Sequence, residues 1–237
     1  MTRRVDEAAF VREQYATEDR LRARKSAYEN AEGDDPRDFA FEAIAEMRPR
    51  RVLEVGGGEG ELAERVLREL GAEVVAVDQS ERMVEIQRSK GVDAHIGDVQ
   101  ELPFADGEFD VAVAAWMLYH VPNLDRGLAE LARVLRPGGR LVAVTNAVDH
   151  LQELWDLARR ATSIGRFAFR SDNGEASLLR HFSRVERRDA YGWLTMDDQA
   201  IQRYAASWDD LASLVKLPPR AEPLRVRRHS TVFVAER

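Results

Sequence analysis

The feature that most constrains the fold is an alternation of short apolar runs with amphipathic segments between residues 51 and 145. The apolar runs have the length of strands, and the segments between them have the apolar spacing of helices. Strands that are apolar throughout are typical of a parallel sheet covered by helices on both faces. The alternation therefore predicts a Rossmann-like, doubly wound α/β fold. We expect strands at 51–55, 73–77, 92–96, 109–115 and 140–145, and helices at 61–70, 80–90 and 124–135.

The segments on either side of this core are less regular. Their patterns predict one or two helices within 1–30, a turn at 33–36, a helix at 37–47, helical stretches within 149–181, a strand at 182–191, a helix at 197–215 and a final strand at 225–236. We expect residues 1–48 to form an N-terminal helical extension or lid and residues 49–237 to form the main domain. Because insertions on a rigid scaffold often carry specificity, we expect 149–181 to cover the site as a substrate-pocket insertion.

Composition narrows the classes of partner. The chain has a net charge of −7, whereas phosphate contacts need a basic surface, so a nucleic-acid partner is disfavoured. Cysteine is absent, which excludes disulfides, thiolate metal sites and a cysteine nucleophile. No apolar run of about 20 residues is present, and the N-terminus lacks the apolar core of a signal peptide. We therefore expect no membrane span and a cytoplasmic location. Monomer and homodimer both stay open.

Polar and glycine residues follow the predicted strands at the points where those strands end. In parallel sheets ligands bind at the carboxyl ends of the strands, so these groups should meet in one crevice. The glycines within 56–60 allow a tight turn and a close approach of backbone to ligand. The helix that follows favours an anion at its N-terminus. Asp78 lies about twenty residues beyond the glycines, a position from which a carboxylate accepts hydrogen bonds from a ribose diol. Taken alone, Asp78 and Asp98 are also ordinary acids at strand ends.

A nicotinamide-dependent oxidoreductase is the first alternative. Its fingerprint is G-x-G-x-x-G or G-x-G-x-x-A after a strand. Counted from Gly56 the last position falls on Glu61, so that register fails; counted from Gly58 it falls on Ala63, so the weaker form survives. Asp98 and the Pro137–Gly139 segment have no explanation under this alternative.

Several segments together carry a family resemblance. They are Glu54–Gly60, Val77–Asp78, Gly97–Val99, Leu102–Phe104, Phe109–Asp110 and Arg133–Gly139. As a set they resemble class I S-adenosylmethionine (SAM)-dependent methyltransferases, and in particular the small-molecule branch that contains the quinone-biosynthesis C-methyltransferases (methyltransferase type 11). The resemblance covers roughly residues 50–146. It implies SAM as cofactor and a seven-stranded sheet, mostly parallel with an antiparallel last strand.

The resemblance also implies roles for individual residues. The glycine loop would bind the methionine end of SAM, Glu54 its ammonium group, Asp78 the ribose, and Asp98 with Val99 the adenine. Many relatives have Cys or Ser at the position of Gly57, and glycine there keeps the backbone role. The expected cofactor-binding set is Glu54, Gly56, Gly57, Gly58, Gly60, Asp78, Gln79, Met83, Asp98, Val99 and Ala115, with Tyr15 as a candidate lid residue.

Methyl transfer depends largely on positioning the donor and the acceptor, so no strict catalytic constellation is required. His120 follows the fourth strand and is the candidate general base, with a structural role equally open. His150 is expected at a surface helix start, and the other histidines are expected to be structural. No metal site is predicted. Aromatic residues are more often core than ligand contacts, but several are candidates for a pocket wall: Tyr15, Tyr28, Trp116, Tyr119 and Trp155.

The predicted function is methyl transfer from SAM to an O, N or C atom of a small-molecule acceptor. A non-catalytic relative that binds SAM is a further alternative, and no sequence feature excludes it. A nucleic-acid methyltransferase is disfavoured, because amino-methylating DNA enzymes carry an Asn or Asp, two prolines and an aromatic after the fourth strand. This chain has Ala115–Leu118 there.

Overall fold

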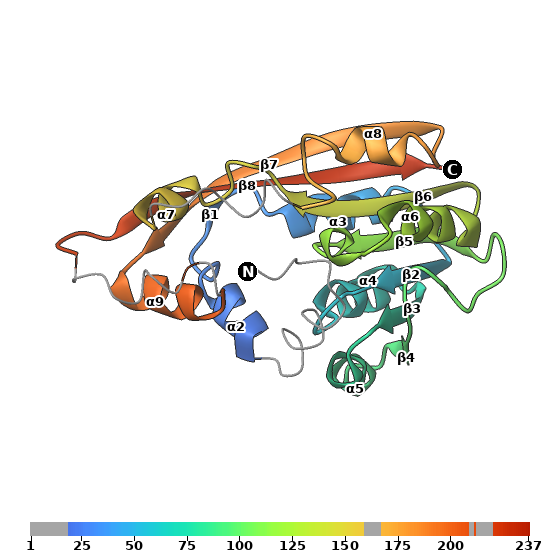
Figure 1. Ribbon diagram of the computed structural model, residues 1–237. Helices are drawn as coiled ribbons and strands as arrows, with labels where there is room; N and C mark the ends of the chain where they lie inside the picture. The colour runs from blue at the N-terminus through green and yellow to red at the C-terminus, as the bar shows by residue number, and fades with distance from the viewer. Residues whose placement is uncertain (1–18, 159–166, 209–210, 212–219) are drawn as a thin grey trace.

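The computed structural model of the protein describes residues 19–158, 167–208, 211 and 220–237. Its centre is an eight-stranded sheet with the strand order β1-β7-β8-β6-β5-β2-β3-β4 (Figure 1). The strands β4, β3, β2, β5 and β6 pair in parallel, whereas β8 runs antiparallel to both β6 and β7. The bounds are β2 Arg51–Val55, β3 Glu73–Asp78, β4 Asp93–Ile96, β5 Phe109–Ala115, β6 Leu135–Asn146, β7 Arg184–Met196 and β8 Leu224–Glu236.

The Rossmann-like fold and the antiparallel last strand are confirmed, but the expected number of seven strands is wrong by one. The additional strand is β1 (Glu32–Gly33), which pairs with Trp193 and Gly192 of β7. Gly33 has a φ of 89°, and a Cβ atom at Gly33 or Gly192 would overlap with the backbone of the opposite strand. Two facing glycines therefore let the chain approach the sheet edge at a place where the sequence predicts only a turn.

Helices cover both faces of the sheet. The helices α3 (Pro36–Ala45), α4 (Glu61–Leu70) and α5 (Glu81–Ser89) pack on one face, and α6 (Leu124–Val134) and α8 (Gly174–Leu178) pack on the other. Side chains of a strand alternate between faces. Accordingly, Val111 and Val113 of β5 belong to the first core, and Ala112 and Ala114 belong to the second.

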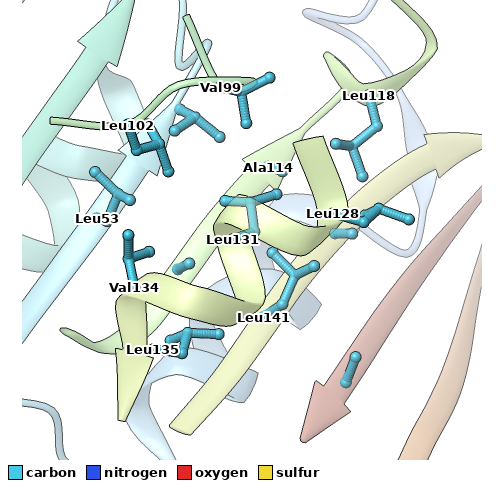
Figure 2. Close-up of a cluster of buried hydrophobic side chains, with 14 of the residues drawn as sticks. Leu53, Val99, Leu102, Ala114, Leu118, Leu128, Leu131, Val134, Leu135 and Leu141 are labelled. Atoms are coloured by element: carbon cyan, nitrogen blue, oxygen red, sulfur yellow. The ribbon is translucent and has the colours of Figure 1, made fainter. Parts of the chain in front are cut away.

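The second core shows why α6 docks where it does. Figure 2 shows Leu128, Leu131 and Val134 of α6 beside Ala114 of β5 and Leu141 of β6. The helix residues are spaced three apart, so they form one apolar stripe, and all three are fully buried. Full burial of such a side chain stabilises the fold by about 1.5–3 kcal/mol.

The strand predicted at 140–145 is longer than expected and begins at Leu135. The sequence predicts that Pro137–Gly139 forms a turn between the helix and the strand. In the structure this segment lies within β6, because Leu135 already pairs with Phe109 of β5. The pairing of β5 with β6 changes register between Phe109, which pairs with Leu135, and Val111, which pairs with Arg140. The additional residues of β6 at this point are accommodated as an irregularity of the strand pair. The strand predicted at 182–191 likewise continues to Met196.

The strands β7 and β8 extend beyond the other strands as a two-stranded ribbon (Figure 1). The helices α7 (Gln152–Leu157) and α9 (Asp198–Ala206) pack around this extension in a third core that includes Leu194 and Val226. The helix α2 (Asp19–Ser26) lies beside α9. The ribbon, α9 and α2 therefore extend the crevice at the strand ends. Among the helices of the described part of the chain, none has the length and apolar character needed to span a membrane.

Candidate active site

A cavity of about 340 Å³ lies at the carboxyl ends of the central strands. This volume is within the range of about 300–1,000 Å³ that small-molecule sites occupy. Its lining comes from the ends of β2, β3, β4 and β5, and also from α2, α9 and β8. The predicted site residues that line it are Glu54, Gly56, Gly57, Gly58, Asp78, Gln79, Asp98, Val99, Ala115 and His120.

The turn between β2 and α4 forms one wall of the cavity with bare backbone. Gly56, Gly58 and Gly60 have φ angles of 61°, 56° and 70°, in the left-handed region that favours glycine. A Cβ atom at Gly56 would lie 2.8 Å from the Cβ atom of Met117, so a side chain does not fit there. Gly60 begins α4 without capping it by a side chain. The loop thus offers backbone N–H groups at a helix N-terminus, where anionic groups bind.

Two predicted cofactor residues do not line the cavity. Gly60 precedes the first residue of α4, and Met83 is a buried residue of α5 whose N–H donates to the hydroxyl of Ser80, the residue that caps this helix, across 3.3 Å. Tyr15, the candidate lid residue, lies outside the described residues.

Glu54 is a buried carboxylate at the end of β2 and is 2% exposed. Its carboxylate accepts a hydrogen bond from the Ala63 N–H in the first turn of α4, while Oε2 has no hydrogen-bond partner within the described residues. Burial, followed by the negative charge of Asp78, raises the pKa of Glu54 to about 7. An unpaired buried carboxylate oxygen is costly, so it indicates that a cation or donor belongs beside it.

Asp78 is the last residue of β3, and Asp98 lies two residues beyond the end of the neighbouring strand β4. Burial raises the pKa of Asp78 to about 6, although the N–H groups of Ser80, Gly58 and Gln79 oppose the rise. Asp98 accepts hydrogen bonds from the Gln100 N–H at 2.9 Å and from the Gln100 amide at 3.1 Å. Three carboxylates therefore face one cavity from adjacent strand ends.

The helix α2 lies over the glycine loop and is held there by charge. Lys25 Nζ lies 2.7 Å from Glu59 Oε2 and 2.5 Å from Glu61 Oε1, and Arg22 Nε lies 3.0 Å from Glu59 Oε1. Burial alone would raise the pKa of Glu59, but the two cations outweigh it and lower that pKa. Leu21 of the same helix lies against Gly58.

The histidines divide differently from the prediction. His120 lines the cavity from the short 3-10 helix η1 (Leu118–His120), with its ring edge-on to Tyr119 at 4.5 Å between centroids. His150 is not at the surface as expected; it is 2% exposed and lines the same cavity. The reason is local backbone geometry, because Leu151 adopts a φ of 56° and its N–H bonds to Arg227 of β8, which turns His150 inward.

The environment of His150 keeps its ring neutral. Its Nε2 lies 2.9 Å from the Tyr28 hydroxyl, and its Nδ1 lies 2.9 Å from the backbone oxygen of His229. Burial lowers the pKa of His150 to about 4. By contrast, His229 lies 2.6 Å from Asp149 outside the cavity lining. The described residues contain no cluster of histidine and acid side chains suited to a metal ion.

Asn146, expected in the crevice because it follows the fifth predicted strand, lines the cavity. The end of the cavity away from the glycine loop also contains residues that the sequence analysis did not single out: Tyr204, Trp208, Arg228 and Ser230. Three of the candidate aromatics, Tyr28, Trp116 and Tyr119, line the cavity, whereas Trp155 is part of the third core. Of the described residues in the predicted insertion 149–181, His150 lines the cavity. The sequence does contain one signal that could have indicated a buried Arg228. Side chains alternate along a strand, and this alternation places Arg228 on the same side of β8 as the buried residues Val226 and Ser230.

Comparison with known proteins adds evidence for part of the chain. Residues 53–143 match the family model described as a methyltransferase domain. The ubiquinone/menaquinone biosynthesis C-methyltransferase UbiE of Methylobacterium nodulans is 37% identical over 106 residues, 41% of this chain and 42% of that protein. The malonyl-[acyl-carrier protein] O-methyltransferase of Pseudescherichia vulneris is 36% identical over 119 residues, 49% of this chain and 47% of that protein.

This chain matches a methyltransferase domain over residues 53–143, the part of the sequence that resembles class I SAM-dependent methyltransferases. It spans about half the length of the curated relatives it matches. The domain match covers β2 to β6 and so includes the glycine loop, Asp78, Asp98 and His120. It does not reach α2, α9 or β8, which form the opposite end of the cavity.

Solved structures resemble the methyltransferase domain together with its flanking elements. The YcgJ protein of Bacillus subtilis superimposes with a TM-score of 0.61 at 19% identity, covering 84% of this chain and 98% of that one. The [4+2]-cyclase SpnF superimposes with a TM-score of 0.67 at 18% identity, covering 99% of this chain and 97% of that one. At these identities the likeness establishes the fold. It does not assign a reaction, since one of these neighbours is described as a cyclase.

Proposed function

We propose that the protein transfers a methyl group from SAM to an O, N or C atom of a small-molecule acceptor. When bound, SAM supplies a methyl group activated by attachment to a sulfonium. The observation that carries the proposal is the unpaired Oε2 of Glu54, which lies beside a bare glycine loop and close to Asp78. SAM carries a cationic amino acid group at one end and a nucleoside at the other, which matches the charge of Glu54 and the arrangement of Glu54, the glycine loop and Asp78 along the cavity.

In this proposal the strand ends hold SAM along its length. Glu54 accepts from the α-ammonium, and the backbone of Gly56–Gly58 approaches the methionine carboxylate. Asp78 accepts from the ribose hydroxyls, while Asp98 with Val99 faces the adenine. Gln79 and Ala115 complete the contact surface, Gly60 and Met83 support the loop and α5 from behind, and Tyr15 stays a proposed lid residue.

His120 is the proposed general base for an acceptor that must lose a proton. A positioned base contributes about 10²–10⁴-fold, while positioning of the two reactants contributes the rest. If His120 has this role, His120→Ala should lower turnover and change its pH profile. Unchanged turnover over a pH series would assign His120 a structural role instead.

The setting of the reaction follows from charge and composition. The net charge of −7 favours a small molecule over a nucleic acid, and we propose a cytoplasmic enzyme that is a monomer or a homodimer. We propose residues 1–48 as a helical extension and lid, 49–237 as the methyltransferase domain, and 149–181 as an insertion next to the acceptor.

Two measurements test the proposal. Calorimetric titration should give binding of SAM and of S-adenosylhomocysteine (SAH), and no binding of NAD. Incubation with methyl-labelled SAM and a bacterial metabolite extract should then transfer label to a small molecule. Binding without transfer would favour the non-catalytic alternative, and absence of binding to a folded sample would exclude both.

A further inference from the structure

Arg228 is a buried arginine at the end of the cavity away from the glycine loop. It is 5% exposed and lines the cavity together with Ser230 of the same strand. Its Nη2 donates to the backbone carbonyl of Asp34, whereas Nε has no hydrogen-bond partner in the described part of the chain. A buried guanidinium that is only partly hydrogen-bonded pays a desolvation cost, which a bound anion would offset.

The carboxylates of Asp34 and of its neighbour Asp35 bind groups other than Arg228. The Asp34 carboxylate accepts from the Tyr191 N–H at 3.0 Å. Asp35 is bound by Arg37, whose Nη2 lies 2.7 Å from Asp35 Oδ2. Within the described residues, no carboxylate oxygen lies within the 4.0 Å of an ion pair to Arg228. The guanidinium therefore has no ion-pair partner among the described residues, although its charge is one of the causes that lower the pKa of Asp35, after the contacts with Arg37.

The backbone around Arg228 leaves room for its guanidinium. A Cβ atom at Gly192 of β7 would lie 3.1 Å from both Nε and Nη2 of Arg228. The same glycine faces Gly33 and permits the pairing of β1 with β7, which brings the Asp34 carbonyl to the arginine. The position of the guanidinium thus depends on two glycines and one backbone carbonyl.

Most other groups at this end of the cavity are neutral and aromatic, and the charged residues Asp35 and Arg37 that also line the cavity pair with each other. Tyr28 and Tyr204 are buried phenols with raised pKa values, because burial disfavours their charged forms. Burial also keeps His150 neutral. Trp208 completes this wall, with the Arg24 guanidinium 5.3 Å from its ring centroid. The surroundings therefore suit an apolar or aromatic body that carries one negative charge.

The sheet register separates Arg228 from the glycine end. Ala115 at the end of β5 pairs with Val144, which pairs with Val232 of β8. Arg228 lies four residues farther along β8 from this rung, which is about 13 Å at roughly 3.3 Å per residue. The acids at the ends of β2, β3 and β4 occupy one end of the cavity, and an arginine occupies the other.

We infer that Arg228 binds a carboxylate of the methyl acceptor, so that the substrate is a small organic acid with an apolar or aromatic body. The inference rests on the proposed function and narrows its substrate class. Arg228 acts as a binding and positioning residue: it fixes the far end of the acceptor while the reacting atom lies near the end of β5. A planar carboxylate matches a guanidinium in shape and charge, and the Nε of Arg228 has no hydrogen-bond partner among the described residues.

The test uses SAH-saturated protein and three pairs of probes, each a carboxylate with its amide: 4-hydroxybenzoate, phenylacetate and hexanoate. Calorimetric titration should show at least one carboxylate binding about tenfold or more tightly than its amide, as expected for hydrogen bonds to a charged group. Arg228→Met should abolish this preference, and Arg228→Lys should retain part of it. Arg225→Met is the matched control, because Arg225 is an exposed arginine on the same strand.

The outcomes separate the two claims. Failure of the wild-type protein to bind SAH contradicts the proposed function, whatever the probes do. If SAH binds but every carboxylate binds no better than its amide, or none binds at millimolar concentration, the role of Arg228 is wrong. A preference that survives in folded Arg228→Met also overturns it. The wild-type comparison needs no variant, so a variant that does not fold leaves the test intact.

Discussion

The carboxyl group of Glu54 occupies the space in which a Cβ atom at Gly57 would lie. The two residues are three apart in sequence, and the turn after β2 folds the second back over the first. The atoms in the way are the flexible end of the Glu54 side chain, which lines the cavity, so a Cβ atom at position 57 would push the carboxylate out of its place. Glycine at 57 therefore permits the carboxylate to stay in the cavity.

The first prediction concerns this pair. Gly57→Ala should displace the Glu54 carboxylate and weaken SAH binding about tenfold, because one charge-assisted contact is lost. The measurement is calorimetric titration in a double-mutant cycle with Glu54→Gln. The effects of the two single changes should not add, since both remove the same contact. Additive effects would mean that Gly57 acts independently of Glu54.

The second prediction concerns pH. The pKa of Glu54 is raised from 4.5 to about 7, so ionisation is harder in the folded protein than in the unfolded one. Below pH 4.5 Glu54 is protonated in both states, and the folded protein keeps its full stability. As pH rises from 4.5 through 7, the unfolded chain ionises Glu54 more readily than the folded protein does, so this part of the free energy of unfolding is lost. Glu54→Gln should remove this loss and stabilise the ligand-free protein at pH 8 by up to about 3 kcal/mol. Denaturant unfolding at pH 5 and pH 8 measures the difference.

The same group links ligand binding to protons. A cationic ligand favours ionised Glu54, so SAM binding at pH 6.5 should release protons and should tighten as pH rises to 8. Titrations in buffers of different ionisation enthalpy report the number of protons released. Asp78, with a pKa of about 6, contributes to the release at the lower end of this range. Glu54→Gln should retain only the Asp78 part, and an unchanged proton count in that variant would contradict the assignment.

Local sequence patterns were sufficient for the elements that hold the cofactor end. The bounds of β5 and α4 agree with the prediction because an apolar run and an amphipathic segment ended by Gly71 are local signals. The inward turn of His150 was not predictable, because it depends on the left-handed backbone of Leu151 and on pairing with β8. Trp116, with a φ of 54°, is a similar case at the end of β5. Tertiary contacts impose this backbone conformation on a bulky residue, and no local sequence pattern predicts it.

The acceptor end of the cavity was the least predictable part. Tyr28, His150, Tyr204 and Arg228 come from four separate segments. Only the sheet topology, with β8 between β6 and β7, brings these segments together. These residues are far apart in the sequence, so no short-range pattern could show that they line one cavity.

The third prediction concerns the ion pair that holds α2 on the glycine loop. Lys25 lies 2.7 Å from Glu59, and their side chains are 32% and 11% exposed. Exposed pairs contribute about 0.2–1 kcal/mol, so Lys25→Met should speed SAH dissociation up to about fivefold. Stopped-flow measurement should also show faster dissociation of the wild-type complex at high salt. Arg68→Met is the control, because Arg68 forms an ion pair with its neighbour Glu69 on α4 at 2.9 Å. Equal effects in the two variants would exclude a lid role for α2.

The fourth prediction concerns the closure of the cavity by Tyr28, whose hydroxyl lies 2.9 Å from His150 Nε2. Tyr28→Phe keeps the ring and removes this contact across 122 residues of sequence, together with the hydrogen bond between Tyr28 and Tyr204. A net hydrogen bond contributes about 0.5–1.5 kcal/mol, so SAH affinity should fall about two- to tenfold. Because His150 has a pKa of about 4, the effect should be the same at every pH between 6 and 8. Tyr191→Phe, on exposed β7, should leave affinity unchanged. A pH-dependent loss would mean that the Tyr28 partner titrates in this range and that the neutral assignment of His150 is wrong.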